Sequence, residues 1–144
     1  MMSEVLKWIV DKDYQLMKEA NYTYEETVSI CRTNESMTVT NVTDWARVGP
    51  RQFVSADLTD IFDALQGRPL SIGLSGKSPY FMNYKSGILT NAPFCMYTMN
   101  HAVTAVGWGK DATAGNYMII KNSWGTGWGE QGFARVGLDD NVCQ

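Results

Sequence analysis

The sequence predicts an α+β fold in which helices come first and short strands follow. Apolar residues recur at helical spacing in residues 3–12 and 55–66, and the second segment begins with a capping Ser or Asp and precedes Gly67. After residue 70 the pattern changes to short apolar runs separated by turns, with no helical segment between them. This order predicts helices beside an antiparallel, barrel-like sheet.

The expected strands follow from alternation and β-branching. Residues 70–74 place apolar side chains on one face at a period of two, and 37–43 alternate in the same way. The other expected strands are a segment that begins near His101 and the runs 117–120 and 133–136, with a Gly-containing turn at 110–116. The polar, Thr-rich remainder of 21–44 is expected to be loop.

Composition and charge exclude several function classes. The chain has 144 residues, 44% hydrophobic and 19% charged, which is typical of a globular protein. Its net charge of −3 and pI near 5.0, without a basic cluster, argue against a nucleic-acid partner. No run of 18 apolar residues occurs, so no membrane span is expected.

The most informative stretch is residues 117–132. An apolar strand runs into Lys121-Asn122-Ser123 and then into two tryptophans, Trp124 and Trp128, that are separated by glycines and a threonine. A strand that only fills a core needs neither the Asn nor the Trp pair, so this strand is predicted to present and shield a polar side chain. About twenty residues upstream lies the single histidine of the chain, His101.

Three motifs together resemble the second half of papain-like cysteine proteases. They are Asn100-His101-Ala102-Val103, Val106-Gly107-Trp108-Gly109 and Lys121-Asn122-Ser123-Trp124-Gly125-Thr126-Gly127-Trp128-Gly129-Glu130. A lone histidine is more often structural, but the three motifs in this order favour a catalytic one. The resemblance implies a two-lobed fold, with residues 1–46 as a piece of the helical lobe and 47–144 as most of the β lobe.

The resemblance also assigns roles to the site residues. A thiol protease needs a thiolate beside an imidazolium, and the imidazole must be aimed. By resemblance His101 is the general acid/base, Asn122 accepts the far ring N–H, and Trp124 covers that hydrogen bond. Trp128 is expected to pack behind Trp124. Core packing is the alternative for both tryptophans and is favoured for Trp128.

The family's nucleophile signature, a Gln followed by Cys-Gly-Ser-Cys-Trp, has no counterpart in this chain. The expected function is therefore that of the histidine- and asparagine-bearing chain of a cysteine endopeptidase, with the nucleophile on a separate light chain. The expected ligands are peptide or protein substrates and a protein inhibitor or propeptide. The alternative is a catalytically inactive papain-fold remnant that binds or supports another protein, and this too predicts a partner.

Substrate-binding residues follow by resemblance as well. The main specificity pocket would be lined by Met1, Met2, Gly73 and Ala102, with Asn100 beside it. The small side chains at Gly73 and Ala102 imply a roomy apolar pocket for Leu, Phe or similar groups.

Three cysteines occur, Cys31, Cys95 and Cys143, and none forms a Cys-x-x-Cys pair. No metal or cofactor is expected. The resemblance pairs Cys95 with Cys143 and leaves Cys31 for a partner outside this chain. Either of the paired cysteines as nucleophile is disfavoured, because neither lies in a matching motif.

Three Asn-x-Ser/Thr sequons occur at Asn21, Asn34 and Asn41, and are glycosylation candidates. Such sequons also arise by chance in Asn- and Thr-rich loops. With the family resemblance they indicate a secreted or a lysosomal or vacuolar protein.

Overall fold

The computed structural model describes residues 2–25, 27–30, 32, 38–49, 57–90 and 99–139. The chain forms two compact units, Met1–Arg47 and Val48–Gln144. Each is described by itself below. No helix among the described residues combines the length and apolar character that a bilayer crossing needs.

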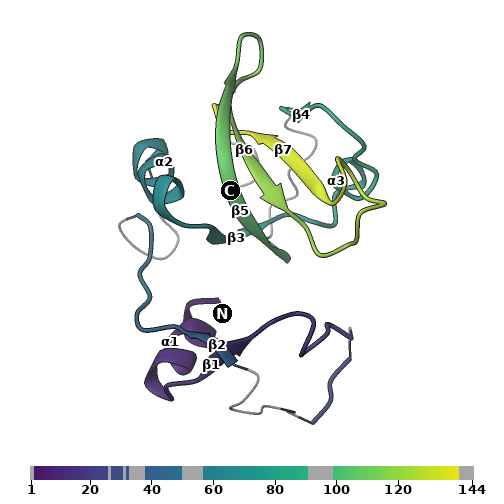
Figure 1. The fold of residues 1–144 in the computed structure, drawn as a ribbon. Coiled ribbons are helices and arrows are strands. Elements are labelled where there is room, and N and C mark those ends of the chain that lie inside the picture. Colours follow the sequence, from purple (N-terminus) through teal and green to yellow (C-terminus); the bar gives the residue numbers. More distant parts are fainter. Residues whose placement is uncertain are drawn as a thin grey trace. The chain divides into compact units, whose positions relative to one another are not determined.

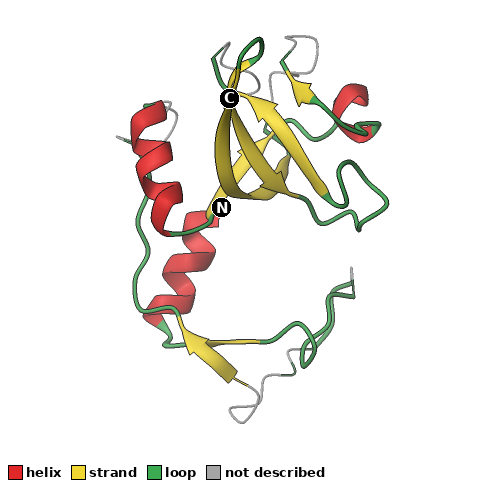
Figure 2. Ribbon diagram, turned by 45° about the horizontal axis from the view of Figure 1, so that its top comes forward, coloured by secondary structure: helices red, strands yellow, loops and turns green. Residues whose placement is uncertain are grey.

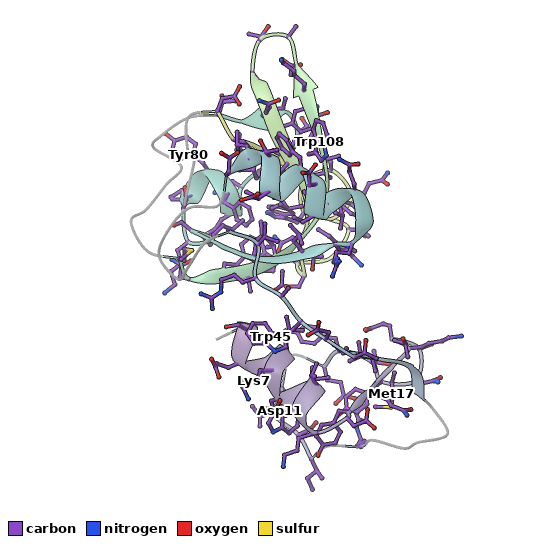
Figure 3. All side chains as sticks on the ribbon, turned by 90° about the vertical axis from the view of Figure 1, so that its left-hand side faces the viewer. Lys7, Asp11, Met17, Trp45, Tyr80 and Trp108 are labelled. Atoms are coloured by element: carbon purple, nitrogen blue, oxygen red, sulfur yellow. The ribbon has the colours of Figure 1, made fainter. Side chains whose placement is uncertain are left out.

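The first unit contains one helix and a two-stranded sheet. Helix α1 (Met2–Asp11) begins and ends within one residue of the predicted segment, and Lys7 bonds Asp11 one turn later on its surface (Figure 3). Strand β2 (Thr38–Asn41) lies within the predicted 37–43 strand. Its antiparallel partner β1 (Gln15–Met17) was not predicted, because three residues are too few to show a period.

Large apolar side chains of the first unit are exposed. Trp8 stacks on Tyr14 with ring centroids 4.6 Å apart, yet 53% of Trp8 is exposed. Tyr24 and Ile30 are 66% and 87% exposed.

The second unit has two helices, which lie on opposite sides of its sheet in Figure 1. Helix α2 (Leu58–Gly67) agrees with the prediction, and its N-cap is Asp57, whose Oδ1 accepts from Thr59 N at 2.8 Å. Helix α3 (Pro79–Met82) contradicts the expectation that no helix follows residue 70. It is a single turn begun by a proline, too short to carry an apolar period.

The sheet has five strands among the described residues, in the order β3-β5-β6-β7-β4. The three pairings that join β3 to β5, β5 to β6 and β6 to β7 are antiparallel, as predicted. Strand β4 pairs with β7 in parallel, which was not predicted. A two-residue strand shows no pattern from which its direction could be predicted. The strands are β3 (Leu70–Leu74), β4 (Ile88–Leu89), β5 (His101–Asp111), β6 (Gly115–Lys121) and β7 (Phe133–Gly137).

The core of this unit lies on the sheet. Alternate residues of β5, β6 and β7 point inward, and α2 packs against them with its apolar side (Figure 2). The buried apolar side chains are Leu74, Phe81, Tyr84, Val103, Ala105, Met118, Ile120, Trp128, Ala134, Val136 and Leu138. The core therefore fixes the ends of β5 and β6, where the candidate site lies.

Candidate active site

The pairing of β5 with β6 brings His101 and Asn122 together. Thr104 pairs with Lys121, and one step further this register brings Asn122 opposite Val103, two residues from His101 on the same face of the sheet. His101 Nε2 lies 2.8 Å from Asn122 Oδ1. The hydrogen bond expected from the sequence is present between these two side chains.

The orientation of the amide decides which ring nitrogen carries a proton. Ser123 N–H also donates to Asn122 Oδ1, at 2.8 Å, so this atom is the amide oxygen. An amide oxygen only accepts, hence Nε2 of His101 is the donor. Nδ1 is then the nitrogen that can accept a proton or return one.

Aromatic rings cover this hydrogen bond. Asn122 is only 7% exposed, and the Trp124 ring lies over His101 with centroids 4.8 Å apart and a tilt of 32°. Phe81, from α3, presents its edge to the imidazole at 5.9 Å. A hydrogen bond screened from water keeps its direction and strength.

Trp128 supports this cover from behind. It is 8% exposed, as core packing predicts, and its indole N–H donates to Phe81 O at 3.0 Å. Its ring meets Trp124 edge-on at 5.5 Å and Phe81 at 4.9 Å. Both its position and its hydrogen bond fix Phe81.

The turn between β3 and α3 forms another wall of the site. Asn100 Oδ1 accepts from Gly76 N at 2.9 Å and from Lys77 N at 3.2 Å. A Cβ at Gly76 would lie only 2.5 Å from His101 Cβ, so the turn's backbone packs directly on the histidine. Gly76 was not predicted, because a glycine's close approach to another side chain leaves no periodic signal.

Asn100 was predicted to bind substrate; its side-chain oxygen holds this turn, and its role toward substrate stays a prediction. Among the described residues, three buried polar atoms lack a hydrogen-bond partner: Ser75 Oγ, Ser78 Oγ and Asn122 Nδ2.

Two of the predicted pocket residues are neighbours. Gly73 pairs with Ala102 across β3 and β5, and Ala102 is exposed. The space beside Gly73 is occupied by Met99, whose Sδ lies 3.3 Å from the position of a Gly73 Cβ. Met1 lies outside the described residues and the side chain of Met2 is not described, so their part in the pocket stays a prediction.

The remaining predicted residues belong to the first unit or lie outside the described residues. Asn21 lies in an exposed turn, and Asn41 is in β2 with an undescribed side chain. Residues outside the described ranges are Cys31, Asn34, Cys95 and Cys143. Within the described ranges no cluster of three or more His, Cys, Asp or Glu could hold a metal ion.

His101 Nε2 is fixed by its hydrogen bond to Asn122 and shielded by the Trp124 ring. A histidine held in this way can transfer protons at its other ring nitrogen, Nδ1. Comparison with known proteins agrees with this geometry. The family model of the papain family cysteine proteases matches residues 1–144.

The chain belongs to the papain family of cysteine proteases. The senescence-specific cysteine protease SAG12 of Arabidopsis thaliana is 35% identical over 124 residues, which cover 86% of this chain and 34% of that protein. The cathepsin L-like proteinase of Fasciola hepatica is 35% identical over 133 residues, 92% of this chain and 39% of that protein.

The fold is that of the family as well. The structure of the bromelain protease from Ananas comosus, in complex with the E64 inhibitor, matches with a TM-score of 0.75 and 31% identity. That match covers 93% of this chain and 58% of the bromelain chain. The chain spans little more than a third of the length of the curated relatives described above.

Proposed function

We propose that this chain supplies the proton-transferring half of a papain-family cysteine endopeptidase. The observation that carries the proposal is the 2.8 Å hydrogen bond from His101 Nε2 to Asn122 Oδ1, under the Trp124 ring. Asn122 orients the imidazole, and His101 acts as general acid and base. Residues 1–46 then belong to the helical lobe of the enzyme and 47–144 to its β lobe.

The proposed reaction uses His101 Nδ1. A cysteine thiolate attacks the carbonyl carbon of the peptide bond, and the imidazolium gives its Nδ1 proton to the departing amine. The neutral imidazole then takes a proton from water, which attacks the acyl-enzyme and releases the carboxylic acid. Throughout, the Nε2 proton stays on its nitrogen because Asn122 holds it.

The nucleophile is proposed to lie on a separate light chain. None of the three cysteines here stands in a Cys-Gly-Ser-Cys-Trp-like segment. The exposed Trp8, Tyr24 and Ile30 of the first unit support a covering polypeptide. Cys31 is proposed to bond to it, whereas a Cys95–Cys143 disulfide closes the β lobe and adds roughly 4 kcal/mol in the simple loop model.

The substrates are proposed to be peptides or proteins with an apolar side chain for the Gly73 and Ala102 pocket. A protein inhibitor or propeptide is the further proposed ligand. The sequons at Asn21, Asn34 and Asn41 support a secreted or a lysosomal or vacuolar location, where disulfides persist.

Thiol labelling tests this proposal. The purified material is treated with E-64, the inhibitor in the matched bromelain complex, or with iodoacetamide, and then mapped by mass spectrometry. The expected label is on a cysteine of a light chain, with Cys31, Cys95 and Cys143 unmodified by E-64. Labelling of any of these three by E-64 would contradict the proposal.

The intact, non-reduced mass gives an independent check. A second polypeptide that dissociates on reduction supports the proposed Cys31 link. A stable monomer that hydrolyses no peptide and takes up no E-64 would instead support the inactive remnant. The His101→Ala variant of the active material should lose about 10²-fold or more of its peptide hydrolysis.

A further inference from the structure

The loop that carries the orienting amide is rich in glycine. Residues 122–132, here called the tryptophan loop, connect β6 to β7 and contain Asn122 and both tryptophans. Within it, Asn122 N–H donates to Gly132 O at 2.9 Å and Gly132 N–H donates to Trp128 O at 2.8 Å. Positive φ angles occur at Gly125, Gly129, Gln131 and Gly132. Such a glycine-rich segment is costly to order, so contacts from outside the loop add to its own hydrogen bonds in holding it.

One carboxylate of the loop makes these contacts. Glu130 Oε1 accepts from Arg135 Nη2 at 2.6 Å and from Gly87 N at 3.0 Å, and Oε2 accepts from Arg135 Nε at 3.1 Å. The Glu130 and Arg135 side chains are 30% and 35% exposed. This ion pair, here called the Glu130–Arg135 clamp, is bidentate and ties the loop to β7 and to the turn before β4.

Tyr84 connects the clamp to the aromatic cover. Its hydroxyl donates to Gly87 O at 2.6 Å, and Arg135 N donates to the same hydroxyl at 3.4 Å. The Tyr84 ring packs on Trp128 at 5.5 Å. Trp128 in turn contacts Trp124, the ring that lies over the histidine.

We propose that Glu130 and Arg135 are positioning residues for the His101–Asn122 pair. The clamp fixes the far side of the tryptophan loop, and the loop then holds Asn122 against Nε2 and Trp124 over the imidazole. A catalytic role for this positioning rests on the proposed function. The His101–Asn122 hydrogen bond that the clamp maintains is present in the structure whatever the function.

Charge supports the same assignment. The hydrogen bonds from Arg135 hold the pKa of Glu130 below its ordinary value of 4.5, although its partial burial opposes this. The groups that face the carboxylate are Arg135, the Gly87 N–H and Tyr84, whose pKa is raised by burial. The clamp therefore stays ionised in mildly acidic solution, and the loop stays held there.

The single histidine makes a direct test feasible. The full chain, in the form in which it is isolated, is labelled with ¹⁵N-histidine, and NMR follows the exchange of the His101 Nε2 proton. In the Glu130→Gln variant, which loses the charge but keeps the shape, we expect this proton to exchange about 10-fold faster or more.

Asp139→Asn is the matched control. The Asp139 carboxylate also bridges backbone and side chain, accepting from Asn116 N at 3.0 Å and from Asn116 Nδ2 at 2.8 Å. Asn116 pairs with Lys110, near the end of the β5–β6 hairpin opposite to His101. This variant should lose stability and leave the Nε2 exchange within about twofold, once exchange is corrected for the free energy of unfolding.

Two further variants, Arg135→Lys and Glu130→Asp, keep the charges and weaken the bidentate geometry. They should also speed the exchange of the Nε2 proton, by a smaller factor than Glu130→Gln. They carry the test if Glu130→Gln does not fold. The proposal is overturned if the Glu130 and Asp139 variants change the corrected exchange of the Nε2 proton equally. Because this measurement needs no hydrolysis, an inactive chain gives the same answer, and the result is distinct from the labelling test.

Discussion

At the residue scale, two tryptophans with similar exposure are expected to differ in function. Trp124 and Trp108 are 40% and 42% exposed; the Trp124 ring lies tilted over His101 at 4.8 Å, whereas Trp108 stacks on Phe62 at 4.3 Å. Trp108 lies on β5 near α2 (Figure 3). Trp124→Ala should therefore lower kcat of the proposed protease about 10-fold by admitting water to the histidine's hydrogen bond, whereas Trp108→Ala should leave kcat unchanged.

Steady-state hydrolysis of one apolar peptide by both variants decides this. Equal kcat values for the two variants would mean that Trp124 is ordinary packing.

Asn122 has a matched control on the same strand pair. Asn122→Ala removes the acceptor of Nε2–H, so the imidazole loses its fixed orientation, and kcat should fall about 10²-fold with little change in KM. Asn116→Ala also removes a side-chain hydrogen bond, to Asp139, and should affect stability alone. The measurement is kcat and KM for both variants with the same substrate. A KM effect without a kcat effect in Asn122→Ala would contradict an orienting role.

The sequence predicted the polar members of the site better than the groups that support them. His101, Asn122 and Trp124 stand in motifs whose order is readable, and the structure brings all three together. Gly76 escaped prediction because its importance lies in a contact across the fold, a glycine backbone against His101. Such contacts depend on tertiary geometry, which residue type alone does not encode.

At the scale of elements, the tryptophan loop contains one glycine that cannot accept a side chain without strain and one that can. Gly129 has φ +57°, and a Cβ there would lie 2.5 Å from Phe133 O and 2.9 Å from the Tyr84 ring. At Gly127 the backbone is ordinary and nothing lies within 4 Å of a Cβ. Gly129→Ala should destabilise the chain by roughly 2–4 kcal/mol, because the strained φ and the backbone clash add.

Gly127→Ala should leave the free energy of unfolding unchanged or raise it by up to about 1 kcal/mol, because the substitution reduces the entropy of the unfolded chain. Urea unfolding of both variants measures the difference. Equal stabilities would show that the loop backbone adapts without cost.

Elements with a clear period were predicted, and elements without one were not. Helices α1 and α2 and strands β3, β6 and β7 carry several apolar residues each at the correct spacing. Helix α3 has four residues and β4 has two, and each exists because the core holds it: Phe81 is fully buried, and β4 pairs with β7. Packing that overrides local propensity cannot be derived from so short a segment.

At the scale of the whole molecule, ionised carboxylates connect segments that are distant in sequence. Asp139 binds Asn116, and Glu130 binds Arg135 and Gly87, whereas Asp57 and Asp111 cap local turns. Each carboxylate accepts hydrogen bonds that lower its pKa. Arg135 holds the pKa of Glu130 below its ordinary value of 4.5. Backbone N–H groups hold the pKa of each of the three aspartates below the ordinary value of 3.8. The carboxylates are thus bonded more strongly in the folded chain when they are ionised.

The sign of the pH dependence follows from these shifts. As pH falls, the unfolded chain takes up protons near the ordinary pKa values, while the folded chain resists until lower pH. The free energy of unfolding should therefore fall as pH drops below the ordinary value of 4.5 for Glu130 and continue to fall past 3.8, where the aspartates titrate. Urea unfolding between pH 3 and pH 7 tests this, and Glu130→Gln should show a shallower decline than the parent, because it has no carboxylate to protonate at the clamp. A parent whose stability rises on acidification, or a Glu130→Gln slope equal to the parent's, would show that the Glu130–Arg135 clamp contributes nothing to the stability of the folded state in acidic solution.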